Sequence, residues 1–136
     1  MELDDARAFI RDNHRAVLVT HRPDGRMQTS PVTVGMDGEG RAVVSSRETA
    51  YKTKNLKRDP RATLCVFNDH FFGAWIQIDG RADIASLPGV MDELVDYYRR
   101  ISGEHPDWDE YRSAMEKDRR VLLRIELERA GPDREG

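Results

Sequence analysis

Short runs of alternating residues, separated by tight turns, are the feature that most constrains how this chain can fold. In the clearest run, residues 121–128, every second residue is apolar and is expected to face inward, while the residues between them, Leu122 included, face outward. This alternation is the period of a half-buried β-strand. Five further strands are predicted, at residues 16–20, 26–36, 41–46, 61–67 and 75–84.

Turn sequences link several of these strands into hairpins. Segment 22–25 places a proline and a glycine where a turn needs them, and segment 37–40 carries two glycines. The run at 16–20 is apolar enough to be buried on both faces. Pro31 has no N–H to donate to a neighbouring strand, so the run that contains it is expected at a sheet edge or bulged at that point.

The spacing of apolar residues predicts four helices, at about residues 4–13, 50–58, 88–101 and 108–117. Asp4 or Asp5 is expected to cap the first helix, and Asp107 the last, with Glu110 three residues further on as in a capping box. The order of elements predicts an α+β fold that is mainly β: a six-stranded antiparallel barrel with peripheral helices. The long insertion at residues 87–119 must cover an end or a side of that barrel.

Length and composition narrow the functional classes. A chain of 136 residues predicts one domain, at residues 1–130, with a flexible tail at 131–136. A net charge of −3 argues against general nucleic-acid binding. No apolar run approaches the roughly 18 residues that span a membrane, no basic signal sequence opens the chain, and the single cysteine, Cys65, fits the cytoplasm. The four histidines are scattered, so no metal site is expected.

A cationic corner follows the third predicted strand. Residues 45–61 contain six basic and two acidic side chains, in a chain whose net charge is −3. The corner joins a strand to a helix start, where backbone N–H groups, hydroxyls and a lysine can together hold a phosphate. The alternative is a solvated basic helix end without a ligand.

The strand interrupted by Pro31 offers a second candidate feature. Beside the proline, Gln28, Thr29 and Ser30 leave backbone groups that a planar ligand could use. The alternative is an ordinary edge strand in which the proline prevents edge-to-edge association.

These segments together resemble a known family. The matching segments are 32–35, 45–52, 55–61, 71–80, 97–108 and 118–123. They are similar to the pyridoxamine-phosphate-oxidase-like family, whose fold is the FMN-binding split β-barrel. More narrowly, they resemble the actinobacterial flavin/deazaflavin oxidoreductases that use coenzyme F420. The resemblance extends over residues 6–132, nearly the whole chain.

The resemblance implies positions for the cofactor. Its phosphate would lie against Lys52, its tricyclic ring would lie along Gln28 to Pro31, and a homodimer partner would add Trp75 and Gln77. Some relatives carry an arginine two residues before the lysine, where this chain has Ala50; Arg47, Lys54 and Lys57 are candidates to replace it. The full set of implied cofactor-binding residues is Gln28, Thr29, Ser30, Pro31, Ser45, Ser46, Tyr51, Lys52, Thr53, Asn55, Trp75 and Gln77.

No nucleophile motif or nucleotide-binding loop stands in the sequence, and none is needed where a cofactor carries the hydride. The resemblance therefore implies no catalytic side chain and an F420H2-dependent reductase acting on an unsaturated small organic substrate. Two alternatives stay open: an FMN-binding oxidoreductase of the same fold, and a non-enzymatic carrier of F420 or flavin. The basic run through Lys54, Lys57, Arg58 and Arg61 favours F420, whose oligoglutamate tail adds carboxylates that FMN lacks.

Overall fold

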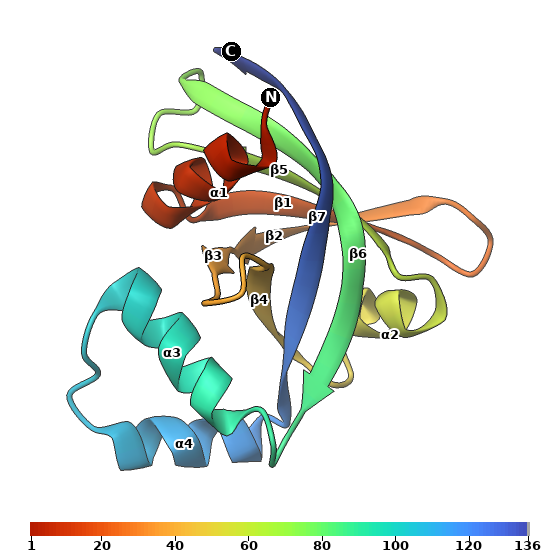
Figure 1. The fold of residues 1–136 in the computed structure, drawn as a ribbon. Helices are drawn as coiled ribbons and strands as arrows, with labels where there is room; N and C mark the ends of the chain where they lie inside the picture. The colour runs from red at the N-terminus through yellow and green to blue at the C-terminus, as the bar shows by residue number, and fades with distance from the viewer. Residues whose placement is uncertain (136) are drawn as a thin grey trace.

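The protein, described here over residues 1–135 by a computed structural model, is a single curled β-sheet with four helices around it (Figure 1). Seven strands pair in the order β2-β1-β5-β6-β7-β4-β3, and each pair is antiparallel. The mainly β architecture predicted from the alternating runs is confirmed. The elements are α1 (Leu3–Asp12), β1 (Arg15–His21), β2 (Met27–Thr33), β3 (Gly35–Met36), β4 (Ala42–Arg47), α2 (Tyr51–Arg58), β5 (Arg61–Phe67), β6 (Ala74–Ser86), α3 (Met91–Ser102), α4 (Trp108–Lys117) and β7 (Arg120–Glu135).

The seventh strand arises because the run predicted at residues 26–36 divides at Val34. Before that residue β2 pairs with β1, and after it Gly35 pairs with Val43 of β4. The Val34 N–H donates to the His14 carbonyl at 2.8 Å, which holds the break in place. Because β2 and β3 are the two ends of the strand order, the chain passes at this break from one edge of the curled sheet to the other. Pro31 lies in the edge strand β2, as predicted.

The barrel interior holds the main core. Leu18, Leu64, Ile76 and Leu123 are each at most 1% exposed, and α1 adds Ala6 and Ile10 at one end. The long strands β6 and β7 run side by side along the molecule (Figure 1). Gly80 permits their close approach, since a Cβ there would clash with the Glu126 carbonyl oxygen.

Helices α3 and α4 pack on the outside of the sheet and form a second core with β4 and β7 (Figure 1). Leu122, predicted to face solvent, is therefore buried at 1% exposure, together with Val43 and Leu94. The helices of the insertion cover this face of β7, and the sequence pattern of the strand alone does not show that cover. Trp108, half-buried, packs against the same cluster.

The helix boundaries agree with prediction within three residues, but one cap differs. Asp107 caps α4 as predicted, and its carboxylate accepts from the Glu110 N–H at 3.1 Å. The N-cap of α1 is Glu2, without a side-chain cap bond, so Asp4 and Asp5 fall in the first turn. There their charges still favour the positive end of the helix dipole.

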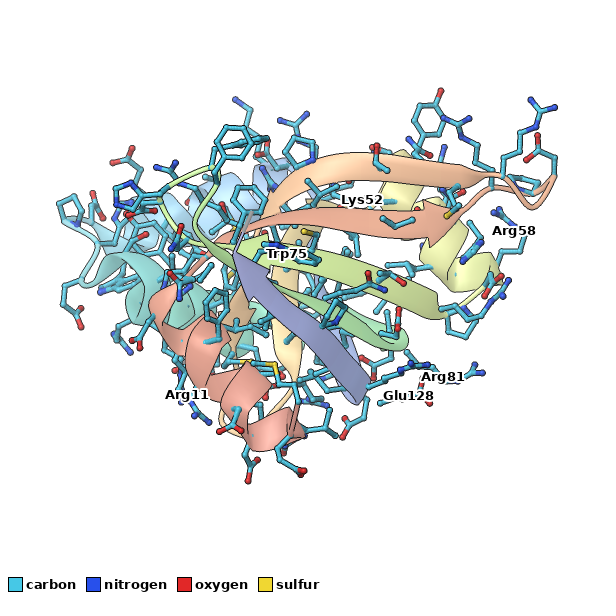
Figure 2. The ribbon with its side chains drawn as sticks, turned by 90° about the horizontal axis from the view of Figure 1, so that it is seen from above. Arg11, Lys52, Arg58, Trp75, Arg81 and Glu128 are labelled. Carbon is cyan, nitrogen blue, oxygen red and sulfur yellow. The ribbon has the colours of Figure 1, made fainter. Side chains whose placement is uncertain are left out.

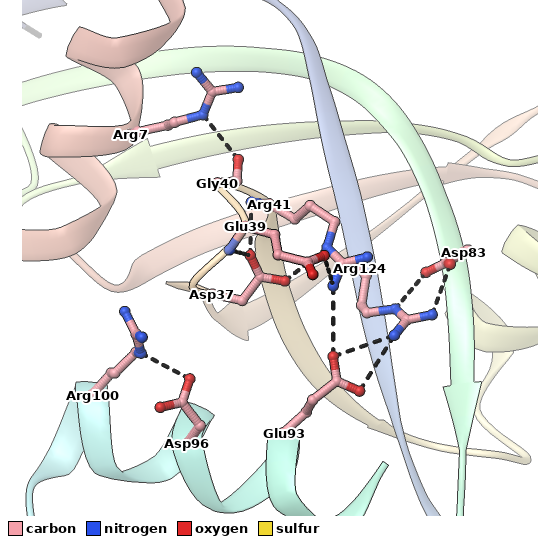
Figure 3. A network of polar contacts seen from close by, with 10 residues as sticks. All are labelled: Arg7, Asp37, Glu39, Gly40, Arg41, Asp83, Glu93, Asp96, Arg100 and Arg124. Atoms are coloured by element: carbon pink, nitrogen blue, oxygen red, sulfur yellow. Dashed lines mark hydrogen bonds and ion pairs between the residues drawn. The ribbon is translucent and has the colours of Figure 1, made fainter. Parts of the chain in front are cut away.

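An ionic network fastens α3 to the sheet (Figure 3). Arg124 of β7 donates two hydrogen bonds to Asp83, at 2.8 and 2.9 Å, and also reaches Glu93 of α3 at 3.2 Å. Arg41 lies 2.7 Å from Asp37 and 3.6 Å from Glu93. Burial raises the pKa of Asp37, but hydrogen bonds from Arg41 and from the Glu39 N–H outweigh it and hold that pKa below its usual value. The network fixes the insertion beside the cationic corner.

Strand β7 continues further than predicted. Its backbone pairs with β6 as far as Glu135, opposite Ala74. Of the predicted tail at 131–136, residues 131–135 thus continue the strand, and residue 136 lies outside the described part of the chain. None of the helices in residues 1–135 combines the length and the apolar character needed to cross a membrane.

Candidate functional site

A cavity of about 510 Å³ opens at the cationic corner, between the barrel edge and the helical insertion. Strand β4 ends at its wall, and α2 places Lys52 there. The insertion contributes three tyrosines and a methionine from α3 and α4, so residues far apart in sequence meet at this cavity. Its lining residues are Pro31, Val32, Thr33, Ser45, Lys52, Tyr97, Tyr98, Tyr111, Met115 and Arg120.

The lining of the cavity holds two basic side chains, Lys52 and Arg120, and no acidic one. Burial lowers the pKa of Lys52, and the charges of Arg120 and Arg47 lower it further. These two arginines face each other across β4 and β7, where they are paired in register. Every charge found to act on Lys52 is therefore cationic, and an anion placed between the three groups would relieve their repulsion.

Three predicted cofactor residues lie behind this surface instead of on it. Thr53, Ser46 and Asn55 are 0%, 1% and 4% exposed. The Thr53 hydroxyl donates to the Arg47 carbonyl at 2.7 Å and lies 2.8 Å from the Ser46 hydroxyl. These bonds tie α2 to the end of β4, so the three side chains orient the helix that presents Lys52.

Asn55 ties the other end of α2 to the barrel. Its amide donates to Thr20 Oγ1 at 3.1 Å and to Gln28 Oε1 at 3.0 Å. The Gln28 side chain is thereby engaged with the helix and does not reach the Lys52 cavity. The strand period explains this position, because Gln28 and Ser30 point toward the barrel interior while Thr29 and Pro31 point away from it.

A second cavity, of about 460 Å³, lies on the other side of α2. Its cations are Lys54 and Arg58, four residues apart on one face as predicted, and Arg22 of the β1–β2 hairpin, which the sequence did not reveal. Arg58 also donates to the His21 carbonyl at 2.6 Å, and so lies toward the hairpin tip while Lys52 lies nearer the centre of the molecule (Figure 2). The lining contains no carboxylate: it is Arg22, Pro23, Gln28, Tyr51, Lys54, Asn55 and Arg58.

Arg61 does not extend this basic surface. Its guanidinium makes a bidentate pair with Asp59, with a shortest contact of 2.7 Å, and this pair holds the pKa of Asp59 well below its usual value. The basic surface at α2 is therefore formed by the side chains of the helix itself, which are Lys52, Lys54, Lys57 and Arg58. Tyr51, 73% exposed, belongs to the second cavity and not to the first.

Trp75 and Gln77 line neither of these two cavities. They lie on the outer face of β6. Gln77 pairs with Cys65 of β5, and Cys65 pairs in turn with Val17 of β1. On its other side, Val17 pairs with Pro31 of β2. Residues opposite each other in antiparallel strands share a face, so one row across four strands joins Gln77 to Pro31. The alternation of buried and half-buried residues along β1 shows that this face is uncovered, where burial on both faces was predicted.

The cavity residues that sequence reasoning missed are Arg120 and the tyrosines of α3 and α4. Tyr97 donates from its hydroxyl to the Thr33 carbonyl at 2.7 Å, and Tyr111 donates to the Leu94 carbonyl at 2.8 Å. Burial raises the pKa of both phenols, that of Tyr111 to about 12. The packing of the insertion against the barrel edge brings the tyrosines to the cavity, and the pairing of β7 with β4 brings Arg120 there.

Comparison with known proteins agrees with this architecture. Residues 3–131 match the model of the pyridoxamine 5'-phosphate oxidase family. The chain belongs to this family. The family predicted from the sequence motifs is therefore confirmed. Among solved structures, a conserved hypothetical protein of Mycobacterium tuberculosis superposes with a TM-score of 0.77 at 22% identity, over 96% of this chain and 82% of that one.

Two further relatives carry functional names. An F420H(2)-dependent biliverdin reductase of Mycobacterium tuberculosis is 27% identical over 127 residues, which cover 93% of this chain and 84% of the relative. A solved structure named as an F420 reductase superposes with a TM-score of 0.68 at 21% identity, over 91% of this chain and 94% of that one. The member of the pyridoxamine 5'-phosphate oxidase family described here is thus similar, over most of both chains, to a protein named for its dependence on F420H(2).

Proposed function

We propose that this protein is an F420H2-dependent reductase that binds the cofactor phosphate in the Lys52 cavity and reduces an unsaturated small organic substrate. The observation that carries the proposal is a cavity whose charged lining residues, Lys52 and Arg120, are both cationic, with the charge of Arg47 also acting on Lys52. Ser45, half-exposed on the cavity wall, adds a hydroxyl donor. This donor set fits a phosphate, for which charge-assisted hydrogen bonds are the strong contacts. The similarity to an F420H(2)-dependent reductase supports the same cofactor.

The reduced deazaflavin would supply the hydride, and the protein would supply binding, orientation and exclusion of water. Lys52 and Ser45 would hold the phosphate, and Pro31 and the wall from α3 and α4 would border the path toward the ring. Ser46, Thr53 and Asn55 would contribute indirectly, because their buried hydrogen bonds set the position of α2.

The second cavity favours F420 over FMN. Arg22, Lys54 and Arg58 surround it without an acidic residue in its lining. F420 carries a tail of several carboxylates that FMN lacks, and these need positive charge beyond the phosphate site. FMN would leave these three cations without a ligand. We therefore expect F420 to bind more tightly than FMN, and we expect this difference in affinity to shrink as salt is added.

The uncovered outer face of the sheet supports a homodimer. It presents Val17, Val19, Cys65 and Trp75, half-buried in one protomer, beside Gln77 and the edge residue Pro31. We expect a second copy to cover this face and to bring its Trp75 and Gln77 to the cofactor held by the first. Such an interface should bury more than about 1,000 Å² in total. Sedimentation at micromolar concentration should show a dimer, and a stable monomer would refute the shared site.

The experiment that tests the function is a parallel titration of the apoprotein with F420 and with FMN, followed by single-turnover oxidation of bound F420H2. Biliverdin is the first acceptor to try because the relative named above reduces it, and other unsaturated compounds follow. Tight F420 binding with acceptor-dependent oxidation supports the proposal. Tighter binding of FMN would favour the FMN oxidoreductase, F420H2 binding without turnover on any acceptor would favour a carrier, and binding of neither cofactor would refute the assignment.

A further inference from the structure

Arg120 begins β7 directly after the turn from α4, and its side chain lines the Lys52 cavity. Its Nε is buried and makes no hydrogen bond within the described part of the chain. The nearest carboxylate oxygen, Asp118 Oδ2, lies 3.6 Å from that nitrogen, which is an ion-pair distance and too long for a hydrogen bond. The side chain as a whole is 27% exposed and lines the cavity, while its Nε is enclosed.

An unpaired buried donor on an arginine is unfavourable, and the neighbours of Arg120 do not relieve it. The hydroxyls of Tyr97 and Tyr111 donate to backbone carbonyls, and neither accepts a bond from Arg120. The charges nearest to it on the cavity side are those of Lys52 and, across the strand pair, Arg47. Arg120 thus holds a buried donor without a hydrogen-bond partner in the described residues, and the charged groups that line the cavity with it are cationic.

We infer that Arg120 is the second cation of the phosphate site, and that with Lys52 it clamps the cofactor phosphate from the opposite wall of the cavity. This inference rests on the proposed function. The geometry prefers Arg120 to the candidates that neighbour Lys52 in sequence. Lys54 lines the second cavity, while Lys57 and Arg47 are exposed and line neither cavity. Arg120 reaches the site from a strand that pairs with β4, nearly seventy residues along the chain.

The two cations have different roles. Lys52 is a compact charge on a flexible stem, whereas the Arg120 guanidinium is planar and can donate two parallel bonds to a phosphate. Ser45 of β4 pairs with Leu122, two residues along β7 from Arg120, so a hydroxyl and a guanidinium lie diagonally across adjacent strands on one face. Arg120 should therefore set the preference for a phosphorylated cofactor over the same ring and ribityl chain without phosphate.

The experiment measures the binding of four ligands to the full chain: FMN, riboflavin, F420 and the deazaflavin nucleoside that lacks the phosphate. The variants are Arg120→Gln, Arg120→Lys and Lys52→Ala, with Arg119→Gln as the matched control. Arg119 neighbours Arg120 in sequence, but it is exposed and lines a different cavity. Circular dichroism and thermal unfolding establish that each variant is folded.

We expect Arg120→Gln to weaken binding of both phosphorylated ligands by about 10- to 150-fold, the effect of losing a charge-assisted bond. The two phosphate-free ligands should change less than about twofold, Arg120→Lys should recover part of the loss, and Arg119→Gln should match the parent. Equal weakening of riboflavin and FMN would overturn the inference, because Arg120 would then act only through the fold. The inference would also fail if the Arg120→Gln variant bound FMN and F420 as tightly as the parent while the Lys52→Ala variant bound them more weakly.

Failure of the proposed function gives a different result, because the parent would then bind none of the four ligands. Inorganic phosphate tests the anion site in that case. Phosphate should raise the unfolding temperature of the parent above that in sodium chloride of equal ionic strength, since a ligand of the folded state stabilises it. The rise should be absent in Arg120→Gln and present in Arg119→Gln. No rise in the parent, or an equal rise in Arg120→Gln, would overturn the role of Arg120.

Discussion

Replacing Thr53 by valine tests whether this residue holds α2 or contacts the cofactor. Valine keeps the shape of the side chain and removes the hydroxyl. Thr53 is fully buried, and its hydroxyl donates to the Arg47 carbonyl at 2.7 Å and lies 2.8 Å from the Ser46 hydroxyl. The substitution therefore leaves a partly buried carbonyl and a buried hydroxyl each short of one partner.

The expected loss of stability follows from these two contacts. A buried polar group without a partner costs about 1–3 kcal/mol. The Ser46 hydroxyl already lies 3.4 Å from the Arg47 carbonyl, so it can turn toward that oxygen and recover part of the loss. We therefore expect Thr53→Val to lower the free energy of unfolding by about 1–3 kcal/mol in total, and the unfolding temperature by about 4 °C per kcal/mol for a chain of this length.

Chemical denaturation measures the change, with Ser46→Ala and the double variant completing a cycle. The double variant should cost less than the sum of the single ones, because each single change leaves a partner unsatisfied. Affinity for FMN should change far less than in Lys52→Ala. A stability equal to that of the parent, combined with a large loss of affinity for FMN but not for riboflavin, would refute the anchoring role and place Thr53 at the phosphate.

Three further predictions concern the charges around the site. Lys52→Ala should weaken F420 and FMN binding alike, by about 10- to 150-fold, and titrations within twofold of the parent would exclude Lys52 from the phosphate site. Lys54→Glu with Arg58→Glu should weaken F420 more than FMN and flatten the salt dependence of F420 affinity; equal salt slopes for the two cofactors in the parent would argue against a tail site. Because the pKa of Asp37 is lower in the folded protein than its usual 3.8, its bonds to Arg41 stabilise the fold fully above that value and cease to do so as the pH falls through the folded pKa. Asp37→Asn should therefore reduce stability at neutral pH and remove part of its decline in acid, and acid unfolding curves of the same shape for both proteins would contradict this.

The sequence by itself determined the local structure and the family. Strand alternation, turn residues and helix periodicity each depend on neighbours within a few positions, so they predicted the helices to within three residues and most of the strands. The Asp107 cap and the edge position of Pro31 were predictable for the same reason, since each follows from backbone groups that the residue itself supplies or lacks. The extended motifs around Lys52 identified the family before any contact was known.

Only the tertiary structure decided which side chains meet. Leu122 is buried because α3 and α4 cover β7, and the run at 26–36 divides because Val34 bonds to His14 and the chain then pairs with the opposite edge of the sheet. Thr53 faces the barrel and Lys52 the cavity although they are neighbours, because the packing of α2 determines which side of the helix is covered. Arg120 reaches Lys52 through the pairing of β4 with β7. Such contacts join segments far apart in the chain, and their free energy comes from burial and charge in the assembled fold, which no local pattern contains.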